Sequence, residues 1–263
     1  MKLAAVFAHP DDDAFGIFGT LALHSAGGIR GMTILATSGE AGPIADPSLA
    51  SRENLGQVRE AEARRAYEAL GLDGMGLRFL GYPDGGVAET DHEELVARVT
   101  DELAEFGPDI VVTFGPEGIT KHDDHVTMHH VGTEAFHRAR ERSNGAGFSK
   151  LLYVAIPQSR IERFQEMQRQ AGKEPFNPED PFQPRGVPDE TVAVWVDCSA
   201  VWRRKYEALR EHRTQAQEVE GIPEAALPLV FGEEHFVQGW PDRPPGSHRL
   251  RDVFEGLPTT TSL

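Results

Sequence analysis

Three nearly unbroken apolar runs constrain the fold of this chain more than any other feature. Segments 2–8, 31–37 and 109–114 read KLAAVFA, GMTILAT and DIVVTF. Strands covered by helices on both faces need no alternation of apolar and polar residues, so such runs are typical of buried strands in a parallel sheet. Further strands are predicted at 77–82, 151–156 and 192–197.

Helical patterns lie between these strands. Segment 53–70 places apolar residues at helical spacing and stops at Gly71, and glycine commonly ends a helix. This alternation predicts an α/β protein, a three-layer α/β/α sandwich with a Rossmann-like, mainly parallel sheet. The other helices are expected near 15–26, 91–106, 124–140, 159–171 and 199–218.

The length of 263 residues allows one large α/β domain or two smaller ones. Strand and helix patterns resume after segment 174–190, so we expect a single domain over 1–263, with a domain linker at that segment as the alternative. Five prolines from Pro175 to Pro188 predict an irregular loop, a candidate lid or oligomer contact. An irregular tail is expected from about residue 241.

Charge and cysteine content exclude several classes of protein. The net charge of -16 argues against nucleic-acid binding and against an anionic membrane surface, because both need clustered Lys and Arg. No apolar stretch approaches the roughly 18 residues that span a bilayer, and the N-terminus reads as a strand, not a signal peptide. Cys198 is the single cysteine, which excludes an internal disulfide and a multi-cysteine zinc site, and a cytoplasmic location is expected.

The chemistry is expected where two turns rich in acid and histidine meet. In a doubly wound sheet of order 3-2-1-4-5, the first and fourth strands are neighbours, and ligands bind beyond their carboxyl ends. The turn after the first strand reads HPDDD at 9–13, and the turn after the fourth contains HDDH at 122–125. The sequence therefore predicts that these two turns face one another across one crevice.

This pairing indicates a metal site. Catalytic zinc commonly takes three His or carboxylate ligands and keeps one position for water, and H-x-x-D at 9–12 with H-x-x-H at 122–125 supplies such groups. Two alternatives remain open. The aspartates after His9 cap a helix, or His125 pairs with His129, four residues on and on the same helix face.

A series of motifs carries a family resemblance. In order between about residues 3 and 236, the chain resembles the PIG-L/LmbE family of zinc-dependent N-acetylglucosaminyl de-N-acetylases, including those of the mycothiol and bacillithiol pathways. The resemblance implies an LmbE-like fold and hydrolysis of an N-acetyl group. The motifs are AHPDDDAF (8–15), TSGEAG (37–42), REAEARRAYEALG (59–71), FLGYPDG (79–85), PDIVVTFGPEG (108–118), HDDH (122–125) and HRTQ (212–215).

The resemblance implies a role for each residue of the two turns. His9, Asp12 and His125 match the zinc ligands of the family. Asp11 matches its general base, and His122 matches the histidine that assists at the reacting carbonyl or the leaving group. The reaction implied is amide hydrolysis by a metal-activated water whose proton Asp11 accepts.

Three further residues are implied as substrate contacts, each with an alternative. Arg59 contacts substrate, or it is a surface helix residue paired with Glu62. Asp84 contacts sugar hydroxyls, or it only builds the P-D-G turn. His212 approaches the site, or it is a plain histidine near the end of a helix. One position departs from the family: Asp13 stands where Glu is usual, and we expect it to support the site.

The resemblance implies a bound Zn²⁺, or another divalent metal such as Fe²⁺, and a small amino-sugar substrate. Candidates are N-acetylglucosaminyl-malate and N-acetylglucosaminyl-inositol, chitooligosaccharides and antibiotic-linked sugars, and a homotrimer or homohexamer is compatible with the family. Two other functions compete: a zinc amidase acting on a thiol conjugate or another acylated amino sugar, and a non-catalytic metal-binding protein. A nucleotide-binding protein is disfavoured, because the first turn lacks G-x-G-x-x-G and its aspartates repel phosphate.

Overall fold

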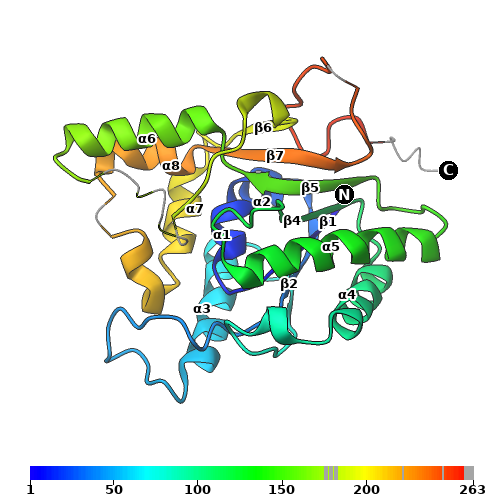
Figure 1. Cartoon of the computed structure of the whole chain (residues 1–263), viewed down its shortest axis with the longest axis horizontal. Coiled ribbons are helices and arrows are strands. Elements are labelled where there is room, and N and C mark those ends of the chain that lie inside the picture. Colours follow the sequence, from blue (N-terminus) through cyan, green and yellow to red (C-terminus); the bar gives the residue numbers. More distant parts are fainter. Residues whose placement is uncertain (175–176, 178–179, 181–182, 221, 245, 258–263) are drawn as a thin grey trace.

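Seven strands form one sheet in the computed structural model of the chain, which describes residues 1–174, 177, 180, 183–220, 222–244 and 246–257 (Figure 1). The order is β3-β2-β1-β4-β5-β7-β6. The first five strands are parallel and follow the predicted 3-2-1-4-5 order, so the predicted α/β fold is confirmed. The strands are β1 (Lys2–Phe7), β2 (Arg30–Leu35), β3 (Gly76–Phe79), β4 (Ile110–Phe114), β5 (Lys150–Ala155), β6 (Val194–Asp197) and β7 (Glu233–Trp240).

Helices form two layers against this sheet (Figure 1). α4 and α5 pack on one another, and α5 lies on β1 and β4, whereas α2, α3 and α7 pack together. Right-handed crossovers explain the separation, because the chain winds outward from β1 and from β4 in opposite directions. The α-helices are α1 (Asp12–Gly16), α2 (Phe18–His24), α3 (Leu55–Ala69), α4 (His92–Phe106), α5 (Asp123–Arg142), α6 (Gln158–Gln170), α7 (Trp202–Leu209) and α8 (Leu227–Phe231).

Two strands at the end of the sheet are antiparallel to their neighbours, and the sequence pattern marks only β6. β7 pairs with both β5 and β6, but its sequence EEHFVQGW has no apolar run that would reveal a buried strand. Glu234 is nevertheless 3% exposed and His235 5% exposed. The Glu234 carboxylate accepts hydrogen bonds from Lys205 and from the N–H groups of Gly19 and Thr20. Partners from other elements thus allow a polar strand to be buried.

The same carboxylate divides the helix that was expected over 15–26. That segment forms α1 and α2 with a break at Ile17, followed by a short 3-10 helix, Ser25–Gly27. Because Glu234 binds the N–H groups of Gly19 and Thr20, α2 starts there with its first donors satisfied. The prediction of one continuous helix is wrong for this reason.

The helix expected over 199–218 is also too long. α7 ends at Leu209, and Thr214 beyond it donates its N–H and its hydroxyl to the Glu62 carboxylate of α3, at 2.9 and 2.6 Å. Hydrogen bonds to another element thus replace those of a continuing helix. His212 lies outside α7, between its end and the short 3-10 helix Arg213–Glu218, so its expected place near a helix end is confirmed.

The Pro-rich segment and the tail are irregular where the structure describes them. Residues 183–190 contain an isolated bridge at Val187 and the start of a short 3-10 helix. The tail 246–257 has no helix or strand, although Val253 and Phe254 are buried. Among the described residues, no helix has the length and hydropathy needed to cross a membrane. The rest of the predicted Pro-rich loop, at 175–176, 178–179 and 181–182, lies outside the described residues.

Burial of His235 is expected to make the fold less stable at acid pH. Its ring packs edge-on against Trp195, with centroids 4.4 Å apart, and burial lowers its pKa from 6.5 to about 3. The pKa in the folded chain is therefore below that of the unfolded chain. The contribution of neutral His235 to the free energy of unfolding is fully present above about pH 6.5. It is lost as the pH falls towards about 3, because between these values only the unfolded chain binds the proton.

Replacing His235 with phenylalanine is expected to reduce this acid sensitivity. Between about pH 7.5 and about pH 5, His235 should remove about 2 kcal/mol of unfolding free energy from the wild type, at ~1.4 kcal/mol per pH unit below 6.5. Urea unfolding at both pH values measures the difference. His248→Asn is the control, because the His248 side chain is 83% exposed. An equal loss in His235→Phe and wild type would contradict the expectation.

Candidate metal and active site

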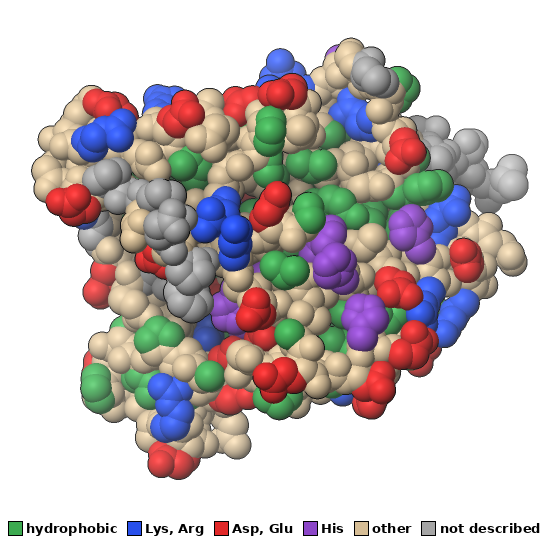
Figure 2. Space-filling model, viewed as in Figure 1, with side chains coloured by type: hydrophobic (Ala, Val, Ile, Leu, Met, Phe, Trp, Pro, Cys, Tyr) green, Lys and Arg blue, Asp and Glu red, His purple; other side chains and the backbone are tan. Residues whose placement is uncertain are grey.

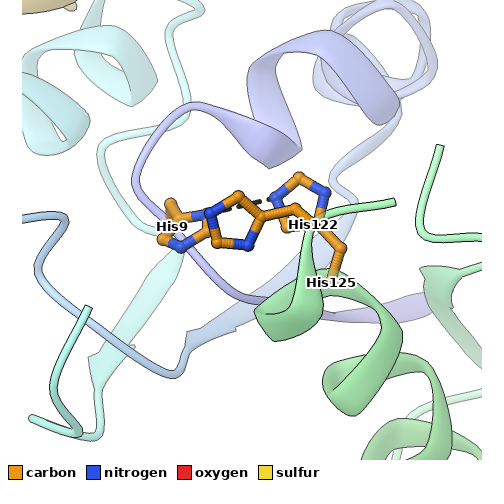
Figure 3. Close-up of side chains that lie close together, drawn as sticks. All are labelled: His9, His122 and His125. Atoms are coloured by element: carbon orange, nitrogen blue, oxygen red, sulfur yellow. Dashed lines mark hydrogen bonds between the residues drawn. The ribbon is translucent and has the colours of Figure 1, made fainter. Parts of the chain in front are cut away.

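The two predicted turns meet at the carboxyl ends of β1 and β4. These strands are parallel neighbours, so the chain leaves both at the same edge of the sheet. The turn after β1 provides His9 and Asp12, and the loop after β4 provides His122 and His125 at the start of α5. Figure 3 shows the three imidazole rings side by side.

Three ligand-type groups lie at a spacing that fits a tetrahedral metal. His9 Nδ1 is 3.1 Å from His125 Nε2. The Asp12 carboxylate lies 3.5 Å from His9 Nδ1 and 3.3 Å from His125 Nε2. Zinc bonds of about 2.0–2.1 Å in tetrahedral geometry separate ligand atoms by about 3.3 Å. Both the chemistry and the spacing of these groups therefore fit zinc.

Hydrogen bonds on the outer sides of the rings direct a lone pair of each histidine into this cluster. His125 Nδ1 is 2.9 Å from the carbonyl oxygen of Gly118 and donates to it, which leaves the Nε2 lone pair facing His9. His9 Nε2 is 3.0 Å from Asp84 Oδ1 and 3.2 Å from Asp124 Oδ2. These contacts assign the His9 hydrogen to Nε2 and leave Nδ1 for a metal.

The electrostatics of the cluster favour a cation. Burial lowers the pKa of His9, but hydrogen bonds to carboxylates outweigh this effect and raise the pKa well above its usual value. Burial raises the pKa of Asp12, but His125 and His9 hold it below its usual range. Negative charge thus gathers around one imidazole, an arrangement that a divalent cation would stabilise. The carboxylates that bond His9 are Asp12, Asp124 and Asp84.

His122 lies beside the cluster with a different hydrogen-bond pattern. Its ring centroid is 4.9 Å from that of His9 and 5.0 Å from that of His125. The backbone N–H of Asp124 donates to His122 Nδ1 at 3.2 Å, which caps α5. A neutral imidazole that accepts at Nδ1 carries its hydrogen on Nε2. His122 therefore offers a hydrogen-bond donor rather than a lone pair for a metal.

Asp11 occupies a strained turn that Arg59 holds in place. Its φ of 113° is in the left-handed region, which is costly for a residue with a side chain. Arg59 Nη2 donates to Asp11 Oδ2 at 2.8 Å and to the carbonyl oxygen of Pro10 at 2.6 Å. Arg59 is 4% exposed, so the alternative of a surface residue paired with Glu62 is wrong. Its predicted contact with substrate stays a prediction.

Two glycines of the TSGEAG motif make room for this arginine. Arg59 Nη1 donates to the carbonyl oxygen of Gly39 at 2.9 Å. A Cβ atom would lie 2.3 Å from Arg59 Nη1 if added at Gly39, and 2.6 Å from it if added at Gly42. The glycines are thus needed for the close approach of the guanidinium, and the motif acts on Asp11 through Arg59.

Gly42→Ala is expected to displace the guanidinium from Asp11 and to lower kcat roughly 10- to 100-fold with little change in KM, since misplacement by about 1 Å has effects of this size. Steady-state kinetics measure both constants. Gly27→Ala is the matched control, because a Cβ atom there meets nothing within 4 Å. Unchanged kcat in Gly42→Ala would show that Arg59 does not position Asp11.

The motifs of Asp84 and His212 did not predict the contacts of Asp84 or the burial of His212. Asp84 Oδ2 accepts the N–H of Ala41 at 2.8 Å while Oδ1 faces His9, and despite burial the His9 contact lowers the pKa of Asp84 to about 2. His212 is 3% exposed, and burial lowers its pKa to about 3. Neither His212 ring nitrogen has a hydrogen-bond partner among the described residues. Substrate contact stays a prediction for both residues.

Asp13, which replaces the usual Glu of the family pattern, is buried beneath the turn. The hydroxyl of Tyr67 donates to Asp13 Oδ2 at 2.5 Å, and Tyr67 also bonds Thr33 at 2.6 Å. Burial raises the pKa of Asp13 to about 6. The side chain thus joins the turn to α3 and β2, which agrees with the support role expected for it.

The remaining histidines of α5 lie away from the cluster. Among the described residues, no group spaced as metal ligands contains His129, so the predicted alternative of a His125–His129 pair is not assembled. His129 Nδ1 lies 2.8 Å from the carbonyl oxygen of Phe114. His92, His130 and His137 line an open surface cavity of about 640 Å³, on the face where Figure 2 shows histidines over α4 and α5. Within the described part of the chain, these three do not approach one another as metal ligands do.

Two functional contacts were not foreseen from the sequence. Asp124 was placed in the acidic turn without a role of its own, yet it is 0% exposed and reaches His9. Glu62 was considered only as a partner of Arg59, yet it binds Thr214. The helical period offers a signal for Asp124, because Met128 and Val131, four and seven residues on, are apolar and place Asp124 on the buried face of α5.

Comparison with known proteins agrees with the predicted family and with the fold. The model of the PIG-L family, described as GlcNAc-PI de-N-acetylase, matches residues 4–136. The 1D-myo-inositol 2-acetamido-2-deoxy-alpha-D-glucopyranoside deacetylase of Geodermatophilus obscurus is 32% identical over 301 residues, covering 98% of each chain.

Solved structures show the same fold with two kinds of named activity. The N,N'-diacetylchitobiose deacetylase of Pyrococcus horikoshii has a TM-score of 0.60 at 22% identity, covering 98% of this chain and 87% of that one. The 4-carboxy-2-hydroxymuconate hydratase of Pseudomonas putida has a TM-score of 0.56 at 19% identity, covering 94% and 100%. The fold alone therefore does not define the reaction.

The named relatives and the site together define the class of protein: the chain is an enzyme of the N-deacetylase type. It belongs to the PIG-L family, because the family model matches half of the chain and a curated relative matches almost all of it. The predicted family is thus confirmed.

Proposed function

We propose that the chain is a metal-dependent hydrolase that removes the acetyl group from an N-acetylglucosamine joined to a polyol such as inositol. The cluster of His9 Nδ1, His125 Nε2 and the Asp12 carboxylate supports this proposal most strongly, because outer hydrogen bonds leave both nitrogens with inward lone pairs. These three residues would hold the metal, with Zn²⁺ as the ion that best suits them and Fe²⁺ as the alternative.

Zinc bound there would supply a Lewis acid that polarises the amide carbonyl and makes water acidic near neutral pH. Asp11, held by Arg59, would accept the proton of the attacking water. The Nε2–H of His122 would donate to the carbonyl oxygen as negative charge develops. The leaving amine needs one proton, which Asp11 returns or His122 provides.

The relatives support the choice of substrate. The protein from Geodermatophilus obscurus is named as an inositol-glucosaminide deacetylase, and it aligns with 98% of this chain. The competing proposals are a zinc amidase for a thiol conjugate or another acylated amino sugar, and a metal-binding protein without activity. The positioned Asp11 carboxylate favours an enzyme over the latter.

Elemental analysis and an acetate-release assay test the proposal together. The purified protein is expected to contain about one divalent metal per chain and to release acetate fastest from N-acetylglucosaminyl-inositol, within a panel that includes N-acetylglucosaminyl-malate and chitooligosaccharides. His125→Ala should lose the metal, whereas His130→Ala, an exposed position on the same helix, should keep it. No metal and no acetate from any member of the panel would refute the proposal.

A further inference from the structure

Two carboxylates converge on one ring nitrogen of the central histidine. His9 Nε2 is 3.0 Å from Asp84 Oδ1 and 3.2 Å from Asp124 Oδ2, and the three side chains are 10%, 7% and 0% exposed. With Nδ1 facing the metal cluster, Nε2 carries a single hydrogen. One acceptor is sufficient to fix the tautomer and the plane of such a ring. The second buried carboxylate is therefore not needed to orient the His9 ring.

Each carboxylate is anchored independently of the other. Asp84 Oδ2 accepts the N–H of Ala41 at 2.8 Å. Asp124 Oδ1 accepts the N–H of Val87 at 3.0 Å, and its Oδ2 accepts that of Gly85 at 2.8 Å. Because backbone groups hold both side chains, loss of one leaves the other in place to accept the His9 hydrogen.

The distances favour a hydrogen bond at Nε2 over a second metal at that nitrogen. Although His9, Asp84 and Asp124 lie close enough together to hold a cation, 3.0 and 3.2 Å are ordinary N–H···O lengths, and binding a metal at both ring nitrogens would require removal of the last hydrogen. The two negative charges instead polarise the N–H bond, which makes Nδ1 a stronger electron donor.

We propose that Asp84 and Asp124 act as a redundant pair of positioning residues that sets how tightly His9 holds its metal. The inference rests on the proposed function, and it gives Asp84 a role other than contact with sugar hydroxyls. The pair also links the metal to the turn after β3, because Gly85 and Val87 of that turn hold Asp124.

Zinc affinity of the apo-protein tests this redundancy. We expect Asp84→Asn and Asp124→Asn each to weaken zinc binding about 10-fold, measured by competition with a chromophoric chelator, and the double variant to weaken it by more than the product of the two. Asp123→Asn is the matched control: it removes the same charge from the adjacent, exposed position and should change affinity less than about twofold. A double variant that equals the product would overturn the redundancy.

A second measurement separates metal support from sugar binding. At saturating zinc, Asp84→Asn should keep the KM of the wild type, whereas an unchanged zinc affinity with a raised KM would overturn the inference in favour of a sugar contact. If Asp124→Asn fails to fold, which thermal unfolding detects, Asp84→Asn still tests whether Asp84 supports the metal, and an unchanged zinc affinity overturns the inference. Wild-type protein that binds no zinc would overturn the proposed function itself, whereas normal binding by wild type and both variants would overturn only this inference.

Discussion

Asp11→Asn is expected to lower kcat roughly 100- to 10,000-fold while the metal stays bound. An amide has nearly the same shape as a carboxylate and still accepts the hydrogen bond from Arg59, which is 2.8 Å long in the wild type. It cannot accept a proton from water near neutral pH. The variant therefore removes proton transfer and leaves the left-handed turn at Asp11, with its φ of 113°, supported.

Kinetics and metal content must be measured on the same preparation. Metal content equal to that of the wild type with strongly reduced kcat supports Asp11 as the base. Normal activity in Asp11→Asn would rule out that assignment, and loss of the metal would place Asp11 among the ligands instead. Asp123→Asn serves as the charge-matched control, because Asp123 is exposed.

Glu234→Leu is expected to lower the free energy of unfolding by about 3–5 kcal/mol, the cost of leaving a buried charge without its partner. Lys205 and Glu234 are 1% and 3% exposed, and their charged groups are 2.7 Å apart. The change would also remove the acceptor for Gly19 and Thr20 at the start of α2. Urea unfolding near neutral pH measures the effect.

Lys205→Met is the informative partner variant and should destabilise less. Glu234 would keep its backbone donors, at 2.7 Å from Gly19 and 2.8 Å from Thr20, and the Thr20 hydroxyl at 2.6 Å. Within the described ranges, the Lys205 ammonium has one other acceptor, the carbonyl oxygen of Phe15 at 2.7 Å. If Lys205→Met were the more damaging change, the remaining donors would not compensate the buried charge of Glu234 for the loss of the ammonium.

The parallel half of the sheet was predictable because its strands carry their own signal. β1 and β4 are buried on both faces, so their sequences are apolar almost throughout. β7 was missed because its burial depends on partners elsewhere in the chain. Glu234 reads as a surface residue until Lys205 and α2 are placed beside it.

The candidate site was predictable in its members but not in their arrangement. Spacing within HPDDD and HDDH, together with the family resemblance, identified His9, Asp12 and His125, and these do come together. The contact of Asp84 with His9 could not be predicted from P-D-G, because this motif predicts the conformation of the turn but not which residues the Asp84 side chain contacts. The sequence likewise does not show whether Arg59 lies on the buried or the exposed face of its helix. Only the folded position of Asp11 decides between the two.

The helix α3 carries both Arg59, which holds Asp11, and Glu62, which holds Thr214 near the other end of the chain. Gln215 then reaches the carbonyl oxygen of Pro43, in the loop that contains the glycines of TSGEAG. The match to the family model ends at residue 136, before Thr214 and Gln215, although the curated relative aligns with almost the whole chain. A fragment that ended at residue 136 would retain every proposed reacting group but would lose the hydrogen bonds of Thr214 and Gln215 to α3 and to the loop at Pro43. The proposed reacting groups thus lie in the first half of the chain, whereas residues of the second half hold the helix and the loop that position those groups.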